Sequence, residues 1–389
     1  MSTLGAEKSQ QARALLEADS LWLTLTREGS DPATNLLFDA SVSGNAAFML
    51  HPDAGVLAIV ANYDEGHVER LGVFNDIQAY EKSFEDALKA SLAKSSPKTI
   101  YINFSETDHL SDGLTHGQFL RLQKLCNEVL PNTTLASSAP HLAKVRGCKT
   151  PDEVRRLKVA INASNTLYEK LLPTLQVGQS EREIQAKMLE IAADMGFDME
   201  LGDYGGALVC INRVGLAHRA PGDDRVQGGD LVILDHGLYF EGYCSDLART
   251  IYFRKPDEED APEAERHAFQ SAFDAISNAF DAVKPGLEGW QVDEVARDHH
   301  LTNGYPEISH ATGHQIGRHI HDGGAILGPR WERYGDAPYI SLEVGNVFTL
   351  EPTILQSPYK PSMLVEENIL ITEKGAQWLS KRQTYLWTV

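Results

Sequence analysis

Two apolar runs of the chain each end in an acidic residue. Asp235 follows the run LVIL, and Glu351 follows the run VFTL. A carboxylate at such a position is costly to desolvate, so it must be protonated, paired or bound to a cation. Each run is followed by an expected antiparallel return strand that bears another acid, Asp246 or Glu366. Four converging carboxylates would repel one another, whereas two divalent ions would neutralise them, so we expect a dinuclear metal site.

The segment 310–321, with the sequence HATGHQIGRHIH, offers the nitrogen ligand that such a site needs. Its glycines favour a loop or strand that comes close to the site over a regular helix. The glutamate of an HExxH motif is absent, which excludes a mononuclear zinc protease of that kind. His218 lies upstream of Asp235 and adds an imidazole outside any apolar run.

Each acid by itself has an ordinary structural interpretation. Asp235 could be a strand-end acid, Asp246 a turn residue and Glu366 an exposed strand residue. Their joint occurrence with a histidine-rich segment favours a metal site. The chain has no GxSxG elbow, no GxxxxGK[ST] phosphate loop and no GxGxxG after a strand, so other common chemistries find little support.

The elements that must position these residues occur twice. Residues 178, 184, 196 and 197 are Gly, Ile, Gly and Phe, and residues 286, 292, 304 and 305 at a constant offset are Gly, Val, Gly and Tyr. A capping box, Thr150 to Glu153, predicts the start of a long helix that Pro173 ends, and a second box at Ser180 opens the next helix. We therefore expect two related α-α-β-β halves that bring Asp235 and Glu351 together near a pseudo-twofold axis.

The first 145 residues mix β-rich runs with helical stretches, as expected of a small α/β domain, and contain no catalytic constellation. The sequence thus predicts domains at 1–145 and 146–389. The formal charge is -20, with 35 Lys and Arg against 55 Asp and Glu, which disfavours nucleic acid and anionic membranes as partners. No signal peptide or membrane span is evident, and the four cysteines form no CxxC pair, so we expect a soluble, cytoplasmic protein with reduced thiols.

Together these motifs resemble the creatinase/methionine-aminopeptidase metallopeptidase family, on its Xaa-Pro peptidase branch (prolidase and aminopeptidase P). The resemblance covers about residues 146–372 and includes His218, His321 and the motifs KTPDE, GDLVILDHG, YCSDLART, HATGHQIG, LEP and VEENILIT. It implies an α+β chain with a C-terminal pita-bread fold of two pseudo-symmetric halves and a smaller, creatinase-like N-terminal α/β domain. It also implies a homodimer.

The resemblance further implies a role for each site residue. Asp235 would ligate one metal, Asp246 and Glu366 would bridge both metals, and His314 and Glu351 would complete the second. A hydroxide bridging the ions would be the nucleophile, and Glu351 would relay its proton to the leaving nitrogen. The residues expected to hold the substrate and its oxyanion are His218, His310 and His321.

The implied substrate is a dipeptide or short peptide with proline after its first residue. An oxygen-rich donor set with one imidazole suits Mn²⁺, with Co²⁺, Zn²⁺ and Fe²⁺ as alternatives. Leu364 and Glu367 stand where many of these peptidases have Arg and Asp, and Arg318 is one candidate to replace that Arg. Hydrolases or lyases of the same fold that act on small osmolytes also keep the ligands, so this alternative stays open. A non-catalytic binding module is disfavoured because all five ligands are present.

Overall fold

The computed structural model describes residues 3–199, 204–215, 219–356 and 360–389. The chain divides into two compact units, Met1–Arg146 and Gly147–Val389. Each unit has its own sheet system and its own hydrophobic core, and each is described by itself below.

The first unit is built on a mixed six-stranded sheet with the order β4-β3-β2-β1-β5-β6. Strands β1, β2 and β3 are antiparallel neighbours, while β4, β5 and β6 join in parallel. The strands are β1 (Ser20–Arg27), β2 (Asn45–His51), β3 (Gly55–Ala61), β4 (Asp76–Tyr80), β5 (Thr99–Ile102) and β6 (Thr134–Ser137).

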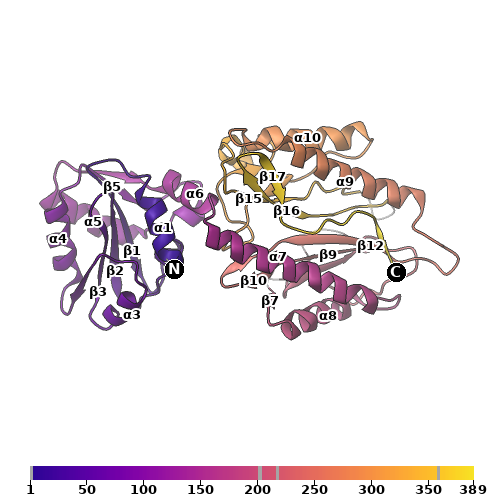
Figure 1. Ribbon diagram of the computed structural model, residues 1–389, viewed down its shortest axis with the longest axis horizontal. Coiled ribbons are helices and arrows are strands. Elements are labelled where there is room, and N and C mark those ends of the chain that lie inside the picture. Colours follow the sequence, from indigo (N-terminus) through magenta and orange to yellow (C-terminus); the bar gives the residue numbers. More distant parts are fainter. Residues whose placement is uncertain (1–2, 200–203, 216–218, 357–359) are drawn as a thin grey trace. The chain divides into compact units, whose positions relative to one another are not determined.

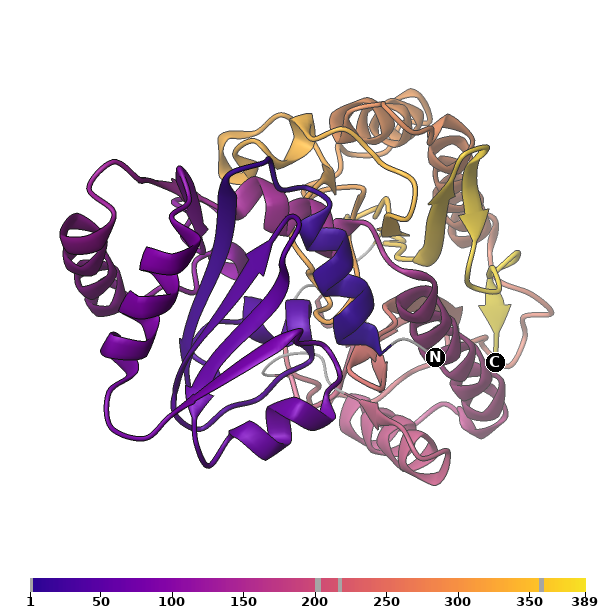
Figure 2. The same cartoon turned by 60° about the vertical axis from the view of Figure 1, so that its left-hand side comes forward.

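Helices cover both faces of this sheet, because alternate residues of the central strands are apolar toward each side. One core contains Trp22 and Phe48 and is closed by the helices α1, α2, α3 and α6; the other contains Leu23 and Met49 and is closed by α4 and α5. Figure 2 shows α1, in indigo, on one side of the strands and the pair α4 and α5 on the other side. These helices are α1 (Leu4–Arg13), α2 (Ala33–Phe38), α3 (Glu65–Arg70), α4 (Phe84–Ser95), α5 (His116–Val129) and α6 (Ala139–Gly147).

The second unit contains two helix pairs with strands between them (Figure 1). The first pair is α7 (Pro151–Leu171) with α8 (Glu181–Asp194), and the second is α9 (Glu263–Ala282) with α10 (Gly289–Thr302). The predicted capping boxes of α7 and α8 are confirmed, since both reciprocal hydrogen bonds form in each box. Helix α7 ends in a 3₁₀ turn, Leu172–Thr174, which contains the proline expected to stop it.

Each helix pair is followed by an antiparallel strand pair, as the repeated pattern predicts. In the first half β9 pairs with β12, and in the second half β15 pairs with β16. The sheet orders are β18-β12-β9-β8, β15-β16-β17, β11-β10-β7 and β13-β14. The strands are β7 (Asp198–Met199), β8 (Ala207–Ile211), β9 (Leu231–His236), β10 (Leu238–Phe240), β11 (Tyr243–Cys244), β12 (Leu247–Tyr252), β13 (Gly313–His314), β14 (Ile326–Leu327), β15 (Val347–Leu350), β16 (Glu367–Thr372), β17 (Gly375–Trp378) and β18 (Trp387–Thr388).

The second half packs around one apolar cluster that joins α9 and α10 to β15 and β16. Within the described part of the chain, no helix is both long enough and apolar enough to cross a membrane. A buried imidazole, His300 of α10, anchors this helix to the end of β15: its Nε2 lies 3.0 Å from the carbonyl of Pro352, and its Nδ1 lies 3.2 Å from the Ser271 hydroxyl. This pattern is satisfied by a neutral ring that donates from Nε2 and accepts at Nδ1.

His300 should make the stability of the fold sensitive to acid. Burial lowers its pKa from 6.5 to about 4, so the unfolded chain takes up this proton before the folded chain does. The free energy of unfolding should therefore fall by up to about 3 kcal/mol as the pH drops from about 6.5 to about 4. Urea denaturation at several pH values measures this slope. We expect His300→Gln to flatten it and His67→Gln, at an exposed position, to leave it unchanged; equal slopes in wild type and His300→Gln would contradict the assignment.

Candidate metal centre

The four acids lie at the ends of the two strand pairs. Asp235 is on β9 and pairs with Ala248, while Glu351 directly follows β15. Asp246 and Glu366 were expected on the return strands, but they immediately precede β12 and β16. Asp246 lies outside β12 because its backbone carbonyl accepts a hydrogen bond from the Asn368 side chain, at 2.7 Å, and not from a neighbouring strand.

A histidine brings these acids into one cluster. Ligand atoms of Asp246, His314 and Glu366 all lie within 4.8 Å of one another. His314 Nε2 is 3.5 Å from Asp246 Oδ2 and 3.4 Å from Glu351 Oε1. The Glu366 and Asp246 residues are 2% and 4% exposed, whereas the side chains of His314 and Glu351 are 13% and 18% exposed. The cluster is therefore buried on the Asp246–Glu366 side and reaches solvent on the His314–Glu351 side.

The carboxylates of this cluster are destabilised in their charged form. Burial, followed by the neighbouring acids, raises the pKa values of Asp246, Glu351 and Glu366 well above the ordinary range. Burial also raises the pKa of Asp235 to about 7. The charge of Asp235 contributes to the raised pKa values of Asp246, Glu351 and Glu366, so these four carboxylates lie within electrostatic reach of one another.

The donor set fits divalent cations. Asp235 Oδ1 is shielded from solvent and has no hydrogen-bond partner among the described residues. His314 is neutral at physiological pH because burial and the neighbouring His321 lower its pKa to about 3. A neutral imidazole and several carboxylate oxygens are the ligands that borderline-hard divalent ions accept, and such ions supply the positive charge that the acids lack.

The other predicted histidines differ in position. The His321 ring is exposed and its centroid is 4.4 Å from that of His314. His310 is half-buried, its Nδ1 is 2.7 Å from the Ala311 carbonyl, and it is near enough to His314 to lower the pKa of that ring. His310 and His321 are thus neighbours of the cluster. His218 lies outside the described residues.

Arg249, a buried residue of β12, supports the cluster from behind and was not predicted. Its guanidinium donates to the carbonyl of Glu366 at 2.6 Å and to the carboxylate of Glu367 at 3.1 Å. Glu367 and its neighbour Asn368 are both fully buried beside the cluster. The sequence feature that could have pointed to Arg249 is a charged residue inside the strand sequence LARTIY, whose other residues are uncharged.

A second support, also missed, holds the histidine segment against α10. Asp293 Oδ1 accepts from the backbone and hydroxyl of Thr312, at 3.1 and 2.8 Å. Arg297 binds the same carboxylate through two nitrogens and donates to the carbonyls of Ile308 and His310. An acid and a base four residues apart are visible in the sequence, but such pairs are usually exposed, so their burial could not be inferred.

Loss of the Asp293 contacts should weaken metal binding. Asp293→Asn replaces one acceptor oxygen by an NH₂ group that faces Arg297, so the segment carrying His314 loses its anchor. We expect metal affinity to fall by roughly 10- to 100-fold, as for residues that orient metal ligands elsewhere. Titration with Mn²⁺ measures the effect, and Asp298→Asn on the exposed face of α10 is the control. Unchanged affinity in Asp293→Asn would show that the anchor does not position the ligand.

Comparison with known proteins shows the family to which this chain belongs. The sequence pattern of metallopeptidase family M24 matches residues 155–373, more than half of the chain. The chain therefore belongs to metallopeptidase family M24, a family that uses divalent metals.

Individual relatives point to one branch of this family. The chain is 27% identical over 308 residues to an Xaa-Pro dipeptidase of Pyrococcus furiosus, covering 77% of this chain and 84% of the relative. It is 30% identical over 253 residues to the uncharacterized peptidase YqhT of Bacillus subtilis, covering 64% of this chain and 66% of the relative.

Solved structures share the fold over nearly the full length. An Xaa-Pro dipeptidase from Bacillus anthracis superposes with a TM-score of 0.77 at 21% identity, covering 99% of this chain and 100% of that chain. An X-Pro aminopeptidase from Thermotoga maritima gives a TM-score of 0.75 at 21% identity, covering 95% and 97%. The predicted architecture, an N-terminal domain followed by a pita-bread catalytic domain, is confirmed by these likenesses.

Proposed function

We propose that this protein hydrolyses the bond between an N-terminal residue and proline in dipeptides or short peptides. The observation that carries the proposal is the junction of Asp246, His314 and Glu366 within the region that matches the family. The Xaa-Pro dipeptidase from Pyrococcus furiosus, which aligns over most of this chain, supports the substrate class. A hydrolase or lyase of the same fold acting on a small metabolite is the alternative, and the peptidase relatives favour hydrolysis of peptides.

The proposed cofactor is a pair of divalent ions, with Mn²⁺ as the expected native metal. Asp235 would hold one ion, Asp246 and Glu366 would bridge the pair, and His314 with Glu351 would hold the other. The support is chemical: four carboxylates whose pKa values are raised and one neutral imidazole form a donor set that is rich in oxygen. When bound, such a pair of ions makes water acidic enough to attack at neutral pH and polarises the substrate carbonyl.

In this proposal Glu351 moves the proton. Of the two carboxylates that lie beside His314 Nε2, Glu351 is the more exposed. Burial and the nearby charge of Asp235 raise its pKa. A carboxyl group of raised pKa can take a proton from water and return it to a leaving nitrogen. The proline nitrogen carries no hydrogen in the intact bond, so its departure depends on such a donor.

The histidines beside the cluster would bind the substrate. His321 and His310 lie next to His314, from where both would contact the substrate. His321 would donate an N–H to the carbonyl of the bond that breaks. His218 would act with them. Leu364 carries no charge and cannot bind a substrate carboxylate. Arg318, which belongs to the same segment as His314 and His321, is the proposed contact for that carboxylate. Its guanidinium lies over the Tyr243 ring, 5.1 Å from the ring centroid.

The direct test is incubation of the Mn²⁺-loaded full chain with Leu-Pro, with the longer peptide Leu-Pro-Gly-Gly and with Leu-Ala. We expect release of leucine from the proline peptides and little or none from Leu-Ala. Metal-loaded protein that cleaves neither proline peptide would overturn the proposed substrate class. The homodimer stays a prediction, for which light scattering of the full chain should give about twice the mass of 42.9 kDa.

A further inference from the structure

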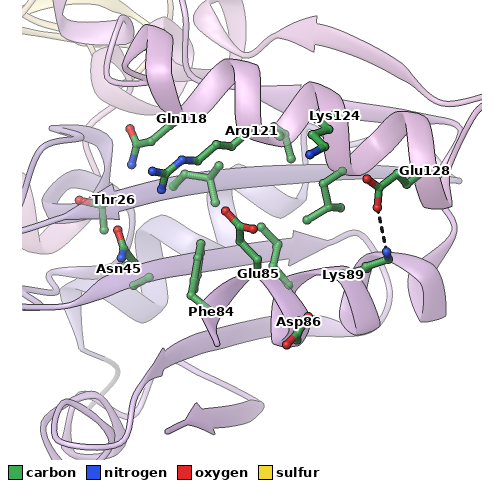
Figure 3. Close-up of a pocket in the computed structure, with 15 residues that line it drawn as sticks. Thr26, Asn45, Phe84, Glu85, Asp86, Lys89, Gln118, Arg121, Lys124 and Glu128 are labelled. Atoms are coloured by element: carbon green, nitrogen blue, oxygen red, sulfur yellow. Dashed lines mark hydrogen bonds and ion pairs between the residues drawn. The ribbon is translucent and has the colours of Figure 1, made fainter. Parts of the chain in front are cut away.

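The first unit contains a cavity that the proposed peptidase chemistry does not use. It has a volume of about 320 Å³ and lies between α4, α5 and the strands β1 and β2 (Figure 3). This volume is at the lower end of the roughly 300–1,000 Å³ that is typical of small-molecule sites. The cavity can therefore hold one small organic molecule.

The wall of this cavity that faces the core is apolar. Leu25 of β1, Leu88 of α4, and Leu122 and Leu125 of α5 contribute to it, and all four are buried. Such a surface favours a ligand with an aliphatic side chain, because apolar area is then removed from water on both partners.

Six charged side chains line the cavity: Glu85, Asp86 and Lys89 from α4, and Arg121, Lys124 and Glu128 from α5. Glu85, Asp86, Arg121 and Lys124 are exposed, so the cavity is open to solvent on this side. At one end Lys89 and Glu128 form an ion pair at 2.8 Å, so their charges compensate each other. Elsewhere Arg121 reaches into the cavity from α5 and Glu85 from α4 (Figure 3). Within the described parts of the chain, neither of these two side chains forms a hydrogen bond or an ion pair.

We propose that this cavity binds a free α-amino acid with an aliphatic side chain. Arg121 binds the carboxylate, since a guanidinium matches a carboxylate with two parallel hydrogen bonds. Glu85 binds the ammonium group, and the leucine-lined wall receives the side chain. A cation and an anion that stand on opposite helices without pairing are complementary to a zwitterion, whereas a simple anion would leave Glu85 as a repulsive neighbour. This inference does not depend on the proposed peptidase activity.

Calorimetric titration of the full chain with L-leucine tests the proposal. We expect one site per chain, and the same affinity in metal-free and Mn²⁺-loaded protein, because the cavity residues belong to the first unit. N-acetyl-L-leucine lacks the ammonium charge and L-leucinamide lacks the carboxylate, and each should bind at least tenfold more weakly than L-leucine.

Two substitutions show whether L-leucine binds in this cavity or at another site. Arg121→Gln should weaken L-leucine binding at least tenfold. Glu85→Gln should also weaken L-leucine binding at least tenfold, but it should strengthen binding of N-acetyl-L-leucine, an anion that Glu85 repels. Lys94→Gln, an exposed position on α4 that does not line the cavity, should leave binding unchanged. A dissociation constant for L-leucine above about 10 mM would overturn the proposal. Unchanged binding in Arg121→Gln and Glu85→Gln, or equal affinity for L-leucine and N-acetyl-L-leucine, would overturn it as well.

Discussion

Replacing Asp246 by Asn should reduce peptidase activity by at least about 10³-fold. Asp246 is one of the two acids that lie within 3.5 Å of His314 Nε2, and its charge contributes to the raised pKa of Glu366. An amide has the shape of the carboxylate but can neither neutralise nor bridge two cations. Loss of about 4 kcal/mol of transition-state stabilisation, which is within what metal ions contribute, corresponds to this factor. Steady-state assays with Leu-Pro at saturating Mn²⁺ measure it.

The stability of metal-free Asp246→Asn separates this effect from unfolding. The substitution removes one of several mutually repelling charges from a buried cluster, so the metal-free variant should melt at the same temperature as metal-free wild type or above it. Asp257→Asn, at an exposed turn, is the matched control and should keep full activity. Activity near that of wild type in Asp246→Asn would remove this residue from the metal site.

Replacing Arg249 by Met should destabilise the second unit by about 3–5 kcal/mol. Arg249 is 1% exposed, and its guanidinium donates to three backbone carbonyls and to the Glu367 carboxylate. Methionine fills part of the space but leaves Glu367 as a buried acid without its counter-charge, and breaking such a pair costs this much. Denaturation of metal-free protein in guanidinium chloride measures the loss.

A second variant tests whether the unpaired acid is the cause. In Arg249→Met combined with Glu367→Gln the buried charge is gone, and the amide can still accept from the hydroxyl of Ser380 or the backbone of Gln383. The double variant should recover a substantial part of the lost stability. Arg254→Met, at an exposed position, should change stability by less than about 0.5 kcal/mol. If Arg249→Met resembled Arg254→Met, the supporting role of Arg249 would be refuted.

The parts of the site that are local in the sequence could be predicted from it. Asp235 and Glu351 end apolar runs, and a carboxylate beside such a run needs a counter-charge wherever the rest of the chain goes. The starts of α7 and α8 could also be predicted, because a capping box is formed by residues three positions apart. The constant spacing of the repeated motif then related the two halves.

The supporting residues could not be predicted because their partners are distant in the sequence. Arg249 bonds to residues more than 100 positions away, and Asn368 takes over the backbone pairing of Asp246 across a similar separation. Nothing in the local pattern of β12 or β16 specifies these bonds. The cavity of the first unit was missed for the same reason, since Arg121 and Glu85 lie on different helices and become neighbours only in the folded domain.

We propose that five side chains distant in the sequence hold a pair of divalent ions. Crystals of the protein grown with Mn²⁺ test it through anomalous scattering. We expect two peaks in each chain, enclosed by the side chains of Asp235, Asp246, His314, Glu351 and Glu366. A structure at full Mn²⁺ saturation with no peak among these side chains, or with a single one, would refute the dinuclear site.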